Sequence, residues 1–106
     1  MTTTTTKENI TVKFDNGLTL TGELTFYPER AGLLELDTLD GEMPERLSIN
    51  LEAYGLTTPK GYTWIKDWSE HAGVTASLVE AGAVQIIETF QVGPFSSNAH
   101  LVKILF

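Results

Sequence analysis

The segment Tyr62–Gly82, with the sequence YTWIKDWSEHAGVTASLVEAG, holds both tryptophans of the chain and its clearest helical pattern. Val74, Leu78 and Ala81 recur at the spacing of one face of a helix, and this predicts a helix over residues 74–81. A helix of this length is marginal on its own. We therefore expect its apolar stripe to pack against a sheet, and we expect the fold to be organised around this segment.

The two ends of the predicted helix carry matching signals. Gly82 stands where helices prefer a glycine after the C-terminus. Asp67 or Ser69 can supply a side-chain oxygen for an unpaired N–H at the start of the helix. Trp64 and Trp68 precede the helix, and each is expected either to anchor it to the sheet or to form an exposed aromatic hot spot in a protein interface.

Outside this segment, apolar and polar residues alternate in short runs that predict β-strands. The predicted strands are residues 9–14, 18–26, 33–39, 46–51, 62–65, 84–92 and 99–106, of which 62–65 is a short one. Asn16-Gly17 predicts a hairpin between the first two. Residues 84–92 carry apolar side chains on both faces, and this predicts a central strand.

The predicted fold class is α+β: an antiparallel sheet of about six strands with one short helix packed on one face. The alternative is a small open barrel with the helix as a plug. Residues 1–8 are expected to be a disordered Thr-rich tail, because they offer nothing to bury. Residues 9–106 are expected to form one domain.

Charge and composition exclude several classes of function. The chain carries 14 acidic and 7 basic side chains, a net charge of −7, and no cysteine. Nucleic-acid binders carry basic patches, so we expect no direct nucleic-acid binding. Cysteine-ligated metals and disulfides are absent. No apolar run is long enough for a membrane helix and no secretory leader is recognisable, so we expect a soluble, cytoplasmic protein without a membrane partner.

Most of the net charge lies between Glu35 and Glu52, where Arg46 is the only basic residue. We interpret this stretch either as a solvated strand face and turn, or as a surface that binds basic groups of a partner protein. The candidate partner-binding residues are Glu35, Asp37, Asp40, Glu42 and Glu45.

The same carboxylates offer oxygens for a hard cation at Asp37, Asp40 and Glu42, but the spacing is not that of a calcium-binding loop. His71 and His100 are the only imidazoles, and neither lies in a zinc-protease motif. Phosphate-binding and nucleophile-elbow motifs are absent as well. We therefore predict no catalytic residue, no metal site and no cofactor, with a weak hydrolase as the least favoured class.

Two further motifs carry a family resemblance. Ile65-Lys66-Asp67-Trp68-Ser69-Glu70 and Leu78-Val79-Glu80-Ala81-Gly82 resemble the pattern of a small bacterial family, domain of unknown function 4313. Its members are often encoded on mobile elements, and the family has no established active site. The resemblance implies a setting in which small acidic proteins bind and block host defence proteins, as anti-CRISPR and anti-restriction proteins do.

The sequence thus predicts a non-enzymatic protein-binding module. The leading hypothesis is an inhibitor of a host nucleic-acid-binding defence protein, acting on a basic partner through the acidic stretch. The alternative is an adaptor or assembly domain that associates with itself through a strand edge, with the Thr19–Thr25 face as its neighbourhood. The expected state is a monomer or a homodimer.

Overall fold

The structure is a computed structural model that describes residues 4–30, 32–38, 43–51, 55–68, 71–92 and 97–106. Its described elements are β1 (Thr5–Lys13), β2 (Thr19–Tyr27), β3 (Leu33–Thr38), β4 (Glu45–Arg46), β5 (Tyr62–Lys66), α1 (Val74–Glu80), β6 (Val84–Val92) and β7 (Ser97–Ile104). The strands form two antiparallel sheets, one with the order β1-β2-β3-β4 and one with the order β5-β7-β6. The α+β class is confirmed.

The predicted hairpin of β1 and β2 is also confirmed. Phe14 N donates to Leu18 O at 2.9 Å, and Gly17 N donates to Phe14 O at 3.0 Å. Gly17 has a φ of 92°, a left-handed conformation that glycine adopts without a steric cost. The Asn16 side chain completes the turn by accepting a hydrogen bond from Leu18 N at 2.9 Å.

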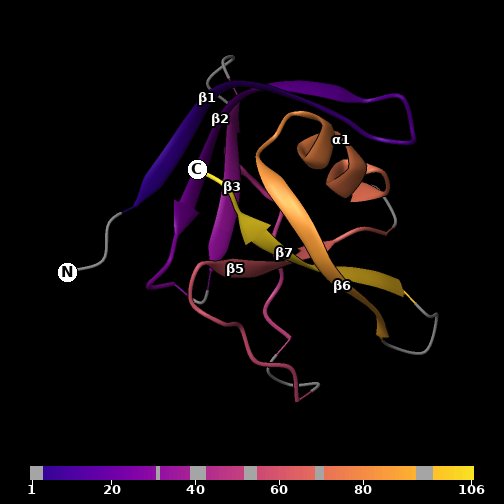
Figure 1. Cartoon of the computed structure of the whole chain (residues 1–106). Helices are drawn as coiled ribbons and strands as arrows, with labels where there is room; N and C mark the ends of the chain where they lie inside the picture. The colour runs from indigo at the N-terminus through magenta and orange to yellow at the C-terminus, as the bar shows by residue number, and fades with distance from the viewer. Residues whose placement is uncertain (1–3, 31, 39–42, 52–54, 69–70, 93–96) are drawn as a thin grey trace.

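Residues 47–49 join the two sheets. Leu47 N donates to Leu34 O of β3, and Ile49 N donates to Trp64 O of β5, both at 2.9 Å. The chain therefore pairs with the first sheet and then with the second within three residues. Figure 1 shows the two sheets facing each other, with α1 beneath the far end of the β1–β2 hairpin.

The helix α1 lies against β1 and β6, the outer strands of the two sheets. Its Val74 and Leu78 side chains are fully buried, as the predicted stripe requires. After the helix, Gly82 N donates to Val79 O and Ala83 N donates to Leu78 O, both at 3.0 Å. These two bonds form a Schellman motif, so the predicted role of Gly82 is confirmed.

Asp67 supplies the hydrogen bonds at the start of the helix, although it lies before the helix in the sequence. Its Oδ1 accepts from Gly73 N at 2.8 Å, and its Oδ2 accepts from Thr75 N at 3.2 Å. The cap residue itself is Gly73, which has no side chain to offer. The other candidate, Ser69, lies outside the described residues.

The buried side chains form two clusters, one on each face of the second sheet. The first cluster lies between the two sheets and under α1, and includes Val12, Leu24, Leu34, Leu36, Ile65, Leu78 and Val102. The second cluster lies on the opposite face of the second sheet and consists of Leu51, Trp64, Val92, Ala99 and Leu101, with Ile49, Leu56, Tyr62 and Trp68 at its border.

Three predictions about the strands require correction. The single sheet of about six strands is wrong, because the strands divide into two sheets. Residues 84–92 do form a strand, but β6 is the edge of its sheet, and β7 is central. The tail expected over residues 1–8 is part of β1 from Thr5 onward, since Thr5–Lys7 pair with Leu24–Phe26 of β2.

Candidate functional site

The structure separates the acidic residues that the sequence grouped together. Glu35 and Asp37 share the outer face of β3, where Asp37 is exposed and Glu35 is half-buried. Glu45 pairs with the buried Leu36 and so lies on the opposite face. Asp40 and Glu42 lie outside the described residues.

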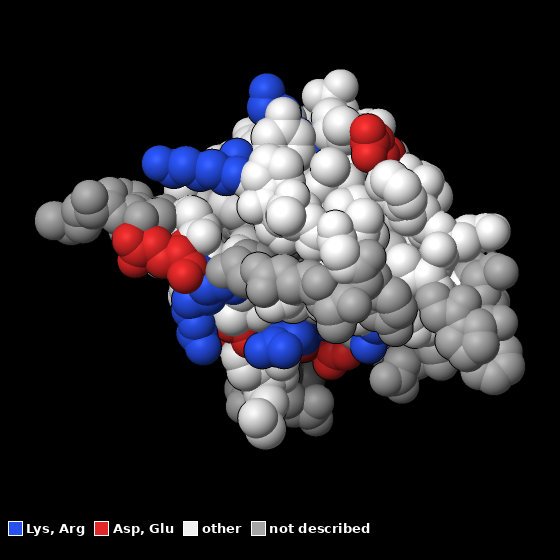
Figure 2. Space-filling view, turned by 90° about the horizontal axis from the view of Figure 1, so that it is seen from below, with Lys and Arg blue, Asp and Glu red and all other residues white. Residues whose placement is uncertain are grey.

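Neighbouring charges further divide this acidic set. Across the strands, Glu35 pairs with Arg46, and Asp37 pairs with Glu23. These two pairs therefore place three carboxylates beside one guanidinium on β2, β3 and β4. In Figure 2, basic and acidic side chains lie interspersed on the face seen from below. Among the described residues, that face does not show a continuous acidic surface.

Glu45 is engaged with a histidine inside the fold. His71 is only 4% exposed, and its Nε2 lies 2.6 Å from Glu45 Oε1. The His71 ring also stacks at a tilt on Phe14, with ring centres 5.7 Å apart. This contact joins β4 to the turn before α1 and gives Glu45 a role in the architecture.

Of the two tryptophans, Trp64 is a core residue. It is 3% exposed, and its Nε1 donates to Thr57 O at 3.1 Å. It is therefore not the exposed aromatic that one interpretation expected. Trp68 is half-buried at the border of the second cluster. An exposed aromatic among the described residues of this region is Phe90, which is 39% exposed and whose ring lies edge-on to Trp64 at 5.5 Å.

The strand β6 presents the most exposed apolar surface of the two sheets. Every residue from Gln85 to Gln91 is exposed, including Ile86 at 42%, Ile87 at 43% and Phe90 at 39%. The register shifts between Ile86 and Glu88, so Ile87 is the extra residue of a bulge. In the sequence, β6 carries apolar residues on both of its faces. We interpreted this pattern as a central strand, but it could also have indicated an exposed apolar surface.

Among the described residues, other segments contact the edges of β1 and β5, while no strand pairs with the outer edge of β6. At the edge of β1, Ser77 Oγ of α1 accepts from Lys13 N at 2.9 Å and donates to Thr11 O at 3.4 Å. The edge of β5 pairs with residues 47–49. Within the described part of the chain, β6 pairs only with β7.

A hydroxyl, an imidazole and a carboxylate follow one another at the other histidine. His100 Nδ1 lies 2.8 Å from Thr89 Oγ1, and its Nε2 lies 3.5 Å from Asp67 Oδ2. This order of groups is that of a nucleophilic triad. However, Asp67 is already engaged at the start of α1, and neither Thr89 nor His100 lines the pockets next to Arg46, Asn9 and Pro28. We assign a structural role to the three residues: their contacts connect β6, β7 and the turn before α1.

The described residues contain no group of three or more His, Asp or Glu side chains that can hold a metal ion. Their helix is too short to cross a membrane. None of the family models, curated proteins or solved structures compared with the chain matches it. The resemblance to domain of unknown function 4313 therefore stays a prediction.

Proposed function

We propose that the chain is a non-enzymatic protein-binding module that adds an extended segment of a basic partner protein to the outer edge of β6. The observation that carries this proposal is the nine-residue length of β6 together with its unpaired outer edge among the described residues. A strand of this length offers a row of backbone N–H and C=O groups that an incoming strand can pair with.

The side chains of β6 supply the apolar part of such an interface. Ile86, Ile87 and Phe90 are each about two-fifths exposed, and Phe90 rests on the buried Trp64. Ile86 lies across from Val102 of the first cluster and Phe90 across from Ala99 of the second, so an added strand would bury apolar side chains on both faces of the sheet. The backbone of β6 supplies hydrogen bonds for the added segment, and these side chains give specificity.

The charge of the chain supports a basic partner. The net charge is −7, and Glu88 is the only charged residue of β6. A protein with this charge attracts cationic partners and repels a second copy of itself at low ionic strength. An inhibitor of a nucleic-acid-binding defence protein, of the kind that the family resemblance implies, is one example of this class.

A second candidate site is the outer face of β3, where Glu35 and Asp37 lie beside Glu23 of β2. In that case the carboxylates would make the main contact with the partner, as the sequence analysis proposed. The two sites lie on different sheets, so substitutions in one leave the other intact.

The experiment immobilises the wild-type chain, Ile87→Lys and Leu18→Lys, and exposes each to bacterial lysate at low and high salt. Leu18 is 50% exposed and lies at the β1–β2 turn, away from β6. Leu18→Lys therefore replaces an exposed aliphatic side chain by a positive charge, as Ile87→Lys does, but outside the proposed binding edge. We expect a partner that the wild type and Leu18→Lys retain and that Ile87→Lys loses. Hydrogen exchange of the complex should show new protection of β6 amides.

Reversal of Glu35, Asp37, Asp40 and Glu42 to Lys separates the two candidate sites. Loss of binding in this quadruple variant together with full binding by Ile87→Lys contradicts the β6 proposal and favours the acidic face. Light scattering after size exclusion tests the remaining alternative. A salt-insensitive dimer that Ile87→Lys dissociates identifies β6 as a self-association edge instead.

A further inference from the structure

The chain has only two arginines, Arg30 and Arg46, and both line the same pocket. They are 16 positions apart in the sequence and come from different elements: Arg30 from the turn after β2, and Arg46 from β4. The pocket has a volume of about 240 Å³, and its other lining residues are Leu33, Ser48, Ile49 and Asn50. This pocket lies away from β6 and adjoins the second candidate site, because Arg46 is the cross-strand neighbour of Glu35.

Hydrogen bonds of the fold hold the lining residues in place. In the turn, Arg30 N donates to Tyr27 O and Leu33 N donates to Arg30 O, both at 3.1 Å. The Arg30 guanidinium also lies over the Tyr27 ring, 5.5 Å from its centre. Arg46 is fixed by the pairing of β4 with β3, and Ser48 Oγ accepts from Leu34 N at 2.9 Å.

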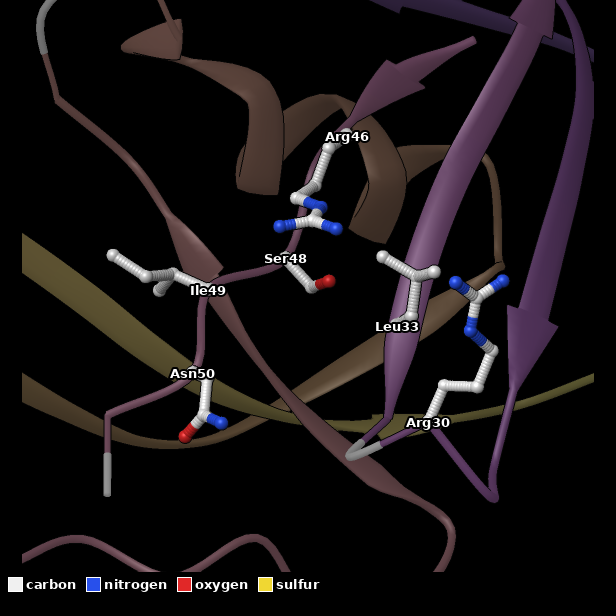
Figure 3. A pocket seen from close by; sticks show the side chains of 6 residues that line it. All are labelled: Arg30, Leu33, Arg46, Ser48, Ile49 and Asn50. Carbon is white, nitrogen blue, oxygen red and sulfur yellow. The ribbon is translucent and has the colours of Figure 1, made fainter. Parts of the chain in front are cut away.

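The side chains of the two arginines border the same pocket. Figure 3 shows Arg46 extending down from β4 and Arg30 extending up from the turn, with the Leu33 side chain between their guanidinium groups in this view. Among the described residues, neither guanidinium forms an ion pair. An anion bound in the pocket is attracted by both positive charges.

The chemistry of the lining defines the class of ligand. Guanidinium groups bind carboxylate and phosphate oxygens in a bidentate geometry. The buried Leu33 and the half-buried Ile49 add apolar walls. The volume lies below the range of about 300–1,000 Å³ that is usual for drug-sized ligands. We propose that this pocket binds a small organic anion, a carboxylate or phosphate group carried on a short apolar body.

One acidic side chain competes with such a ligand. Glu35 is the cross-strand neighbour of Arg46 on the same face of the sheet. Its charge lowers the local positive potential and so weakens the binding of an anion. Glu35→Gln is therefore expected to raise the affinity for the anion, an effect opposite to that of removing either arginine.

The test titrates ¹⁵N-labelled protein with benzoate and with phenyl phosphate, which share an apolar ring and differ in their anionic group. Benzyl alcohol serves as the neutral control. We expect saturable shifts of the Arg30 and Arg46 Nε–Hε signals with at least one of the two anions, and none with benzyl alcohol. The anion that binds more tightly assigns the ligand to carboxylates or to phosphates.

Variants decide whether the arginines carry the binding. Arg30→Gln and Arg46→Gln are each expected to weaken it about tenfold or more, because hydrogen bonds between charged groups are lost. Arg46→Lys keeps the positive charge but loses the planar guanidinium group that can bind an anion in a bidentate way. It should therefore weaken anion binding less than Arg46→Gln does. Lys60→Gln removes one positive charge from outside the pocket and should leave binding almost unchanged.

Amide spectra and urea midpoints of these variants show whether each remains folded. The proposal is overturned if neither anion gives a saturable shift. It is equally overturned if a folded Arg30→Gln/Arg46→Gln double variant still binds as the wild type does, or if Lys60→Gln weakens binding as much as the arginine variants.

Discussion

At the scale of single residues, Gly22 fixes how closely β2 and β3 approach each other. A Cβ atom built on Gly22 would lie 1.8 Å from the backbone oxygen of Asp37, far inside van der Waals contact. Gly22 also pairs with both β1 and β3, so it lies in the middle of the first sheet. Only a residue without a side chain fits there, since the obstructing atom belongs to the backbone and is not a movable side chain.

We predict that Gly22→Ala lowers the free energy of unfolding by about 3 kcal/mol, at or above the upper end of the range for overpacked sites. Gly17→Ala is the matched control. A Cβ there meets nothing within 4 Å, so only the strain of its φ of 92° remains, roughly 1 kcal/mol. Urea unfolding of both variants measures the difference. Equal midpoints for the two would contradict the close approach of β2 and β3.

The two arginines illustrate the limit of prediction at this scale. In the sequence, Arg46 is one positive charge within an acidic stretch, and nothing in the spacing relates it to Arg30. They become neighbours only because the turn after β2 and the β3–β4 pairing bring them to one pocket. The reverse holds for Glu35 and Glu45, which are close in sequence but lie on opposite faces of the first sheet.

At the scale of the elements, the fold treats its strand edges differently. The helix α1 contributes Ser77 to the edge of β1, where the Ser77 hydroxyl accepts from Lys13 N and donates to Thr11 O. A single side chain thus replaces two backbone partners of a missing strand. The strand β6 has no comparable cover among the described residues, although its bulge interrupts regular pairing.

We predict that Ser77→Ala destabilises the protein by about 1 kcal/mol, the usual contribution of a hydrogen bond. It should also speed hydrogen exchange of the Lys13 amide more than that of other β1 amides. Ala76→Ser, at an exposed position of the same helix, is the control: it should cost only the smaller difference in helix propensity and leave the Lys13 exchange rate unchanged relative to other β1 amides. Unaltered Lys13 exchange in a folded Ser77→Ala variant would show that the hydroxyl does not cover this edge.

The elements predicted correctly are those with local signals. The hairpin follows from its Asn-Gly turn, and α1 follows from its apolar spacing and Gly82. The predicted strand over residues 46–51 was less successful. Its first residue belongs to β4, while residues 47–49 pair with both β3 and β5. Its alternating pattern specifies which side chains are buried, but the choice of partner depends on residues far away in the sequence.

At the scale of the whole molecule, the second sheet connects the two hydrophobic clusters. On β5, Ile65 belongs to the first cluster and its neighbour Trp64 to the second. On β7, Val102 belongs to the first cluster and its neighbour Leu101 to the second. Alternation along a strand places consecutive side chains on opposite faces, so each of these strands contributes to both clusters. The sequence predicted this alternation but not the division into two sheets, which depends on long-range pairing.

Because β5 and β7 are shared, we expect the two clusters to unfold in one cooperative transition. Both tryptophans belong to or border the second cluster, so their fluorescence reports on that cluster alone. Leu34→Ala removes a fully buried side chain from the first cluster and should cost about 2–5 kcal/mol. We predict that it shifts the fluorescence midpoint in urea as far as the far-UV circular dichroism midpoint. Leu18→Ala, at an exposed site, should shift neither. A fluorescence midpoint that stays in place while the dichroism midpoint falls would mean that the second cluster is an independent unit, and that β5 and β7 do not couple the clusters.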